Sequence, residues 1–281
     1  SKKMLNLRGR LLSLERPLVM GILNTTPDSF YSNSRISPEA SDLILQRAST
    51  MIRQGASILD IGGYSTRPGA LDPKPEEEIN RVVPVISLIR THFPDIAISI
   101  DTFRAEVAQA AVEEGADIVN DVSGGNLDDK MFDTVAQLNV PYILMHMRGT
   151  PQTMGELTDY PHFPDTILRE LGEKLDRLRR LGLKDVIIDP GFGFAKTPDQ
   201  NFGLLAYLSL FRELGCPILV GVSRKSTITR TLGIPTEEAL NGTTVLNTIA
   251  LMNGASILRV HDVLEAKQAI VLTECVKKFD E

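Results

Sequence analysis

Polar and charged side chains that could bind or transform a small molecule recur in this sequence at one kind of place. Each follows a short apolar, β-branched run, as Asn24 follows residues 18–23 and Ser223 follows residues 218–222. Carboxylates, amides and cations brought together in this way could hold an anion and a polar ring. The residues at such positions are Asn24, Ser65 to Pro68, Asp101, Asn120 with Asp121, Met145 with His146, Asp189, Ser223 to Lys225, and Arg259 with His261.

One group of these residues is suited to an anion. Asn24, Arg67, Arg259 and His261 supply hydrogen-bond donors and positive charge for a diphosphate, and the last two precede an expected helix start, whose dipole favours anions. The chain has a formal net charge of −6, which gives no basic surface for nucleic acid or anionic lipid. We therefore predict small-molecule partners, with neither nucleic acid nor a membrane as a partner.

A second group is suited to a flat heterocycle. Asn120, Asp189 and Lys225 combine hydrogen-bond acceptors with donors, as an amino-pyrimidinone edge would require. The glycines of residues 189–194 would let the backbone approach such a ring, with Phe192 and Phe194 as apolar walls. That segment lacks the third glycine of a dinucleotide fingerprint and the Gly-Lys-Ser/Thr of a nucleotide loop, so neither cofactor is expected.

Several of these residues also have an ordinary structural interpretation. Asp101 could cap the next helix, and Asp262 with Glu265 could form a capping box. Lys225 could be a solvated loop cation, and His146, in an apolar strand, is more often a core histidine than a catalyst, so it is left outside the predicted site. Their convergence at one place in the fold would favour the functional interpretation.

The elements that would bring these residues together alternate between strands and helices. Apolar runs at residues 18–23, 58–61, 96–100, 117–120, 142–145, 186–189, 218–222 and 256–260 are typical of buried parallel strands. Helical periodicity separates them, for example from Ser37 to Gln54, with Ser37 as N-cap. This pattern predicts a single α/β domain over residues 1–281, a (β/α)8 barrel with its core at about 17–279; a doubly wound sheet is the alternative. In a barrel the carboxyl ends of the strands share one face.

Asp60 and the two cysteines bear on what lies inside this fold. Asp60 lies within an apolar strand, so its carboxylate needs a buried partner. Cys216 and Cys275 have no metal-ligand spacing, which argues against zinc or a disulfide framework. No secretory signal or membrane-spanning run is recognised, and we expect a cytoplasmic enzyme.

Taken in order, the motifs resemble those of the dihydropteroate synthase family. The resemblance runs from Met20 to about Val263, and one departure is Tyr64, where many members have Glu. The matching segments are MGILNTTPDSF (20–30), DIGGYSTRPG (60–69), SIDT (99–102), NDVSGG (120–125), LMHM (144–147), DPGFGF (189–194), GVSRKS (221–226) and RVHD (259–262).

The resemblance implies an enzyme that joins p-aminobenzoate to a 6-hydroxymethyl-dihydropterin diphosphate, as a homodimer and a target of sulfonamides. It implies Mg2+ as cofactor, bound by Asn24, and Asp101, Lys225 and Arg67 as catalytic residues. The implied pterin contacts are Asp101, Asn120, Met145, Asp189, Lys225 and Arg259. The implied diphosphate contacts are Asn24, Arg67, Arg259 and His261, and the implied p-aminobenzoate contacts are Phe30, Thr66, Pro68, Phe192, Lys225 and Ser226.

Three other functions share part of this pattern. A pterin-dependent methyltransferase barrel would use the Asn and Asp contacts but has no need of the cluster of Arg67, Arg259 and His261. A Schiff-base aldolase would use Lys225. A catalytically silent member would serve as a binding module, and the intact set of ligand residues argues against it.

Overall fold

The structure of the chain, a computed structural model, describes residues 3–24, 31–32, 35–63 and 73–280. Its parallel strands form one eight-stranded sheet in the order β10, β9, β8, β7, β6, β3, β12, β11. A parallel bridge from Ile188 to Ile218 joins the two ends of that order. The sheet is therefore closed, as predicted, and the doubly wound alternative is wrong because it would leave two open edges. The strands are β3 (Leu18–Asn24), β6 (Ala56–Gly62), β7 (Ala97–Asp101), β8 (Ile118–Asp121), β9 (Tyr142–Met145), β10 (Val186–Asp189), β11 (Leu219–Val220) and β12 (Ile257–Val260).

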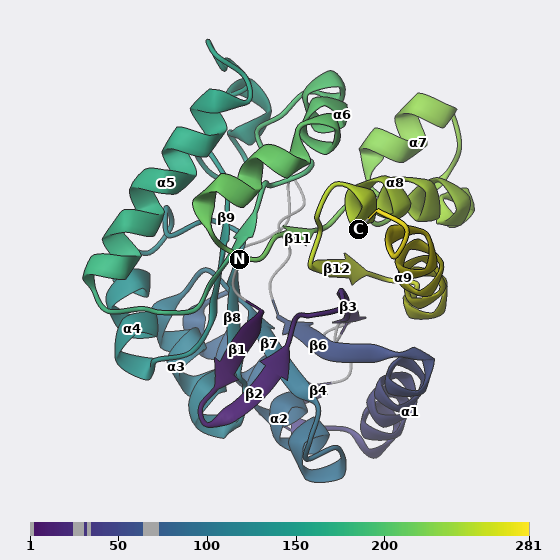
Figure 1. Cartoon of the computed structure of the whole chain (residues 1–281). Coiled ribbons are helices and arrows are strands. Elements are labelled where there is room, and N and C mark those ends of the chain that lie inside the picture. The colour runs from purple at the N-terminus through teal and green to yellow at the C-terminus, as the bar shows by residue number, and fades with distance from the viewer. Residues whose placement is uncertain (1–2, 25–30, 33–34, 64–72, 281) are drawn as a thin grey trace.

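Helices surround this barrel on the outside (Figure 1). The first, α1, begins as predicted: Pro38 is its first residue, and the Ser37 hydroxyl accepts a hydrogen bond from the Ala40 amide at 3.2 Å. The described helices are α1 (Pro38–Gln54), α2 (Pro75–His92), α3 (Ala105–Glu114), α4 (Met131–Leu138), α5 (Asp165–Arg180), α6 (Pro198–Ala206), α7 (Ser226–Leu232), α8 (Leu240–Met252) and α9 (Val263–Lys277).

Each barrel strand divides its side chains between two environments, because successive residues of a strand point to opposite faces. Outward residues such as Leu59 and Ile98 pack in one cluster with the surrounding helices. Inward residues near the strand starts form a second cluster, to which every strand of the sheet contributes one side chain. These apolar residues make the floor of the barrel interior: Met20, Ile58, Ala97, Ile118, Ile143, Ile187, Leu219 and Ile257.

An N-terminal hairpin covers that floor. Strands β1 (Met4–Leu7) and β2 (Arg10–Ser13) pair antiparallel, and Figure 1 shows them crossing in front of the barrel. Leu5, Leu7 and Leu14 are buried in the same cluster as the floor residues. The hairpin precedes residue 17, where the predicted core starts, and yet contributes to the core. A second short pair, β4 (Tyr31–Ser32) with β5 (Arg35–Ile36), follows β3.

Candidate active site

The inward face of the strands changes from apolar to polar one step above the floor. Two residues after Ile58 comes Asp60, two after Ile118 comes Asn120, and two after Ile257 comes Arg259. The period of two that builds the floor therefore also sends these polar side chains into the barrel mouth. The same step carries Ser99, Met145 and Asp189.

Arg259 is the centre of a buried network in this mouth. Its Nε donates to Asp60 Oδ2 at 2.8 Å, and its Nη2 lies 3.4 Å from Asp101 Oδ2. Asp60 is 2% exposed and also accepts hydrogen bonds from the Ser99 hydroxyl and from Asn120 Nδ2. The prediction that Asp60 needs a buried partner is confirmed, and Arg259 supplies the opposite charge.

Asp101 is held in a state close to protonation. Burial, and then the nearby charge of Asp60, raise the pKa of Asp101 to about 8, against the opposing effect of Arg259. Asp101 caps no helix, because α3 begins four residues later, at Ala105. Its carboxyl group instead lies beside Arg259 in the barrel mouth, where burial favours the protonated form.

Asp189 and Lys225 form a second part of the mouth. Asp189 Oδ1 accepts from the Gly191 amide at 2.9 Å, and burial raises the pKa of Asp189 while Lys225 opposes that rise. Lys225 Nζ donates to the Phe192 carbonyl at 2.6 Å and lies 4.9 Å from the centre of the Phe194 ring. Burial lowers the pKa of Lys225 to about 8. The Asp189 carboxylate and the Lys225 amino group thus both lie in this part of the mouth.

Asn120 carries an unused acceptor. Its Nδ2 donates to Asp60, but its Oδ1 is buried without a hydrogen-bond partner among the described residues. A buried polar atom in this condition indicates a group from outside the chain, since it otherwise loses free energy on desolvation. The acceptor suits an N–H of a ring bound in the mouth.

His261 and Ser223 lie on the rim beside α9. The backbone amide of His261 donates to Ser223 Oγ at 3.1 Å, and that hydroxyl lies 2.8 Å from His261 Nδ1. If the hydroxyl donates to Nδ1, the other ring nitrogen carries the hydrogen and is available to an anion. Burial, followed by the charge of Arg259, lowers the pKa of His261.

Asp262 does not form the predicted capping box. It makes no capping hydrogen bond to α9 and instead accepts from Arg224 Nε at 2.8 Å and Nη2 at 3.1 Å. The fork of Arg224 matches a carboxylate with two parallel bonds, which outweighs one contact to a backbone amide. Arg224 adopts a φ of 52° in this arrangement. The pair fixes the turn between Ser223 and Lys225.

A cavity of about 500 Å³ opens beside these groups. Its lining includes Phe194, Gly221, Ser223, Lys225, Ser226, Arg259 and His261. Phe192 lies elsewhere: its ring is 2% exposed within the main core, so only its carbonyl reaches Lys225. Of the two predicted aromatic walls, Phe194 lines the cavity.

The remaining predicted residues differ in how far the structure describes them. Asn24 is the last residue of β3 and is exposed at the mouth. Met145 is 2% exposed and packs with Val122 and Met147 beneath Phe194. Arg67, Phe30, Thr66, Pro68 and Tyr64 lie outside the described residues.

Sequence reasoning missed one set of buried charges next to this mouth. Lys196 is 9% exposed, contacts His146 Nδ1 at 2.8 Å, and is connected through that ring to Glu170. The available signal was a lysine directly after Phe194 and Ala195, in a segment already expected to approach a ligand.

Comparison with known proteins agrees with this geometry. The sequence matches the pterin binding enzyme family over residues 20–261. The dihydropteroate synthase of Synechocystis sp. is 46% identical over 252 residues, which are 89% of this chain and 86% of that protein. The chain belongs to the dihydropteroate synthase family.

Solved structures of dihydropteroate synthases share the fold. One from Xanthomonas albilineans with 4-aminobenzoic acid is 38% identical, with a TM-score of 0.88 over 99% of both chains. Another from that organism, in complex with 7,8-dihydropteroate, is 35% identical, with a TM-score of 0.85 over 98% of both chains. The family assignment thus extends over nearly the whole length of the chain. In the described parts of the chain, no helix has both the length and the apolar character needed to cross a bilayer.

Proposed function

We propose that this chain joins p-aminobenzoate to 6-hydroxymethyl-7,8-dihydropterin diphosphate and releases pyrophosphate, as a transferase of folate biosynthesis. The observation that carries the proposal is the ring-binding set on one barrel mouth: the free Asn120 acceptor, the Asp189 carboxylate and the Lys225 ammonium. Dihydropteroate synthases that resemble this chain are known with 4-aminobenzoic acid and with 7,8-dihydropteroate.

The pterin end of the site works by complementarity. Asp189 accepts from N–H groups of the amino-pyrimidinone edge, Asn120 Oδ1 accepts from another, and Lys225 donates to a ring acceptor. Met145 packs against one face of the ring, and Arg259 against the other. A ligand without these N–H groups would leave buried acceptors unpaired, which makes the site selective.

The diphosphate end works by charge. His261 lies on the rim, and we place Asn24 and Arg67 around the same anion. Arg259 already contacts Asp60 and Asp101 in the structure. Arg259 therefore contributes positive charge near the diphosphate while its hydrogen bonds to Asp60 and Asp101 are kept.

The reaction breaks the bond between the pterin methylene carbon and the diphosphate oxygen and forms one from that carbon to the arylamine nitrogen. The amine is neutral at pH 7 and loses one proton after attack, so no strong base is needed. Departure of pyrophosphate ahead of attack leaves positive charge on the pterin. Asp101 faces that charge, and its carboxylate form is stabilised as the charge develops.

Mg2+ fits the diphosphate end of this site. No group of three or more His, Cys, Asp or Glu side chains that could hold a metal occurs within residues 3–24, 31–32, 35–63 and 73–280. Mg2+ is commonly held by few protein oxygens together with substrate phosphates and water, so the Asn24 amide oxygen is a suitable ligand. When bound, the metal offsets the charge of the leaving group.

Removing the metal should weaken the binding of pterin diphosphate. We expect calorimetry to show a loss of affinity of about tenfold when EDTA replaces Mg2+ for the wild-type chain. Asn24→Ala should show a clearly smaller difference between the two conditions. An equal dependence on Mg2+ in both proteins would remove Asn24 from the metal site.

Lys225→Ala should weaken both substrate sites together. Lys225 reaches the pterin pocket, and its neighbour Ser226 lines the same cavity, so one substitution disturbs both contacts. We expect a loss of about tenfold or more in pterin affinity and a raised KM for p-aminobenzoate. Unchanged values for both would exclude Lys225 from the pocket.

An assay of pyrophosphate release tests the reaction itself. Continued release of pyrophosphate over many turnovers should require both the pterin diphosphate and p-aminobenzoate, and should match the dihydropteroate formed. A methyltransferase barrel or a silent binding module would release none. A lysine adduct trapped by borohydride with a carbonyl substrate would instead indicate an aldolase.

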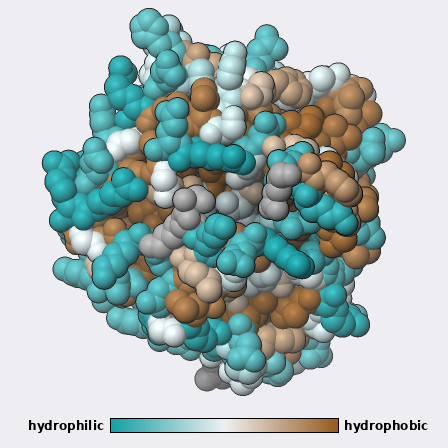
Figure 2. Space-filling model, in the orientation of Figure 1, coloured by the Kyte–Doolittle hydropathy of each residue, from teal (hydrophilic) through white to brown (hydrophobic). Residues whose placement is uncertain are grey.

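We propose that the chain acts as a homodimer through the outer faces of α8 and α9. Figure 2 shows apolar side chains gathered on the side of the molecule where these helices lie. A second copy of the same surface would cover them, as an isologous interface requires. The exposed apolar residues on the two helices are Val245, Ile249, Met252, Leu264, Val271, Leu272 and Val276.

The dimer can be tested on this surface alone. Sedimentation should give twice the mass of one chain for the wild type, and Val271→Glu with Leu272→Glu should shift it to a single chain. Leu11→Glu, at another exposed leucine, is the control and should leave the mass unchanged. A wild-type protein that sediments as a monomer would contradict the proposal.

A further inference from the structure

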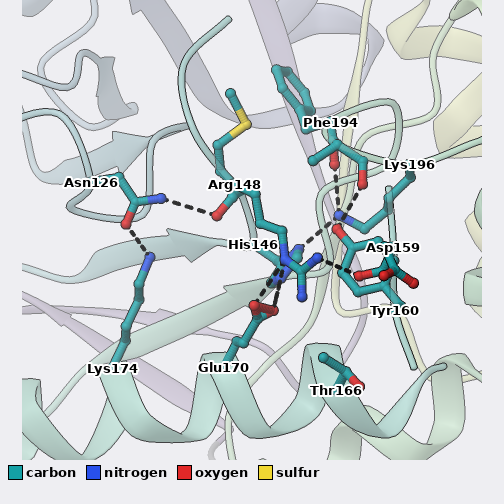
Figure 3. Close-up of polar contacts among 12 residues, drawn as sticks. Asn126, His146, Arg148, Asp159, Tyr160, Thr166, Glu170, Lys174, Phe194 and Lys196 are labelled. Carbon is teal, nitrogen blue, oxygen red and sulfur yellow. Dashed lines mark hydrogen bonds and ion pairs between the residues drawn. The ribbon is translucent and has the colours of Figure 1, made fainter. Parts of the chain in front are cut away.

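A buried lysine outside the proposed substrate contacts holds the loop that carries Phe192 and Phe194. Lys196 Nζ donates to the Phe194 carbonyl at 2.8 Å and contacts His146 Nδ1, also at 2.8 Å. The residue is 9% exposed. Figure 3 shows its ammonium group between that carbonyl and the histidine ring. Lysine is seldom buried in this way unless it is paired with other polar groups.

The histidine joins Lys196 to a carboxylate on α5. The Glu170 carboxylate only accepts, so His146 Nε2 carries the hydrogen that it donates to Oε2 at 2.9 Å, and Nδ1 accepts from Lys196 Nζ. Burial lowers the pKa of Lys196 to about 7, and its amino group donates to Nδ1 in either protonation state. Glu170 also accepts from Arg148 Nε at 2.9 Å. We name Lys196, His146, Glu170 and Arg148 the relay. Hydrogen bonds join each of these four residues to the next, which restrains their geometry.

Burial agrees with this protonation pattern. Burial, and then the charge of Lys196, lower the pKa of His146 to about 4, so the ring is neutral at physiological pH. Burial alone would raise the pKa of Glu170, but hydrogen bonds from His146 and Arg148 lower it to about 2. The Glu170 carboxylate is therefore charged. Its hydrogen bond fixes the orientation of the neutral His146 ring, and that ring in turn fixes the position of the Lys196 amino group.

The relay and the proposed pterin contacts meet in one short loop, residues 191–194. Lys196 binds the Phe194 carbonyl, and Lys225 binds the Phe192 carbonyl at 2.6 Å. Gly191, at a φ of 82°, brings the loop against β9 so closely that a Cβ there would overlap the His146 carbonyl oxygen and lie 3.0 Å from Lys196 Nζ. Lys196 and Lys225 therefore hold carbonyls two residues apart in one tightly packed loop, and we expect a shift at Lys196 to reach Lys225 through it.

We propose that Lys196 is a positioning residue, which acts through the loop 191–194 to aim the Lys225 ammonium at the pterin. This rests on the proposed function of Lys225. Within the described part of the chain, Lys196 makes one hydrogen bond to a residue of the cavity lining, and it goes to the Phe194 carbonyl, so we expect its effect to pass through the loop. A lysine that only stabilised the fold would affect binding independently of Lys225.

The test is a double-mutant cycle on binding. Lys196→Met should weaken pterin diphosphate in calorimetry by about tenfold or more, and Lys196→Arg, which keeps a charged donor, should weaken it less. In a Lys225→Ala background, Lys196→Met should add no more than about twofold, because the group that it aims is gone. The matched control is Lys174→Met, a lysine of the same region whose ammonium contacts Asn126 and not the loop; it should change affinity by less than about twofold.

Two outcomes would overturn the role of Lys196. Losses that multiply fully in the double variant would show that Lys196 acts independently of Lys225, and a Lys196→Met variant that binds like the Lys174→Met control would show no role. Thermal unfolding of each variant separates lost binding from lost fold. Because the cycle is read from binding, it decides the question even if the wild type releases no pyrophosphate, an outcome that would overturn the proposed reaction alone.

Discussion

Arg259→Leu should lower turnover by about a thousandfold and also destabilise the protein. The guanidinium is the positive partner of Asp60 and Asp101, which lie within the barrel mouth. Removing one partner of a buried ion pair leaves an uncompensated charge and typically costs about 3–5 kcal/mol. Loss of a preorganised charge beside the reacting atoms accounts for the turnover. The measurements are kcat from the pyrophosphate assay and the free energy of unfolding in urea.

A second substitution separates these two effects. Asp60→Asn combined with Arg259→Leu removes both charges of the 2.8 Å pair. We expect the double variant to recover much of the lost stability while its turnover stays low. Arg259→Lys should be intermediate in stability, because one ammonium cannot contact both carboxylates with the geometry of a guanidinium. Normal turnover in either variant would exclude Arg259 from the chemistry.

Asp101→Asn should lower kcat by about a hundredfold while the Kd of pterin diphosphate changes by less than about threefold. Burial and the charge of Asp60 raise the pKa of Asp101 to about 8, so its neutral form is accessible near pH 7 before reaction. An amide resembles that neutral form and should bind substrate nearly as well. Only the positive charge that develops on the pterin during the reaction is stabilised by the Asp101 carboxylate, and an amide cannot replace it there. Calorimetry and steady-state kinetics on the same preparation measure the two effects.

Matched losses in kcat and affinity would assign Asp101 to ground-state binding instead. Ser99→Ala is the control, because its hydroxyl donates to Asp60 in the same network and carries no charge. It should change kcat much less than Asp101→Asn does. A larger effect of Ser99→Ala on kcat would show that the loss in Asp101→Asn reflects disruption of the whole hydrogen-bond network and not the Asp101 carboxylate itself.

The barrel and the location of its polar rim could be predicted from the sequence because one rule controls both. The period of two along each strand places Ile58 in the floor and Asp60 in the mouth, and the same holds for Ile257 and Arg259. The N-terminal hairpin was missed, although Leu5 and Leu7 alternate with polar residues before the turn at Arg8 and Gly9, both at positive φ. That is a hairpin signal.

Partners across the fold could not be predicted in the same way. Asp262 lies in a good position for a helix cap, and only the approach of Arg224 from another loop, 38 residues away, explains why it binds a guanidinium. His146 likewise has no local signal for Glu170 or Lys196, which lie 24 and 50 residues away. Local sequence can indicate which nearby contacts a residue could make, but tertiary packing decides whether it makes them or binds a residue far away in the chain.

The hairpin of β1 and β2 bears on the order in which substrates bind and the product leaves. Among the described residues, it covers the apolar end of the barrel, and the polar side chains lie at the opposite end. In the proposed binding mode the pterin reaches Asn120 and Asp189 at the polar end, and we expect the arylamine to approach over it from the same side. We therefore expect the bicyclic substrate to bind first and the condensed product to leave before the next pterin binds.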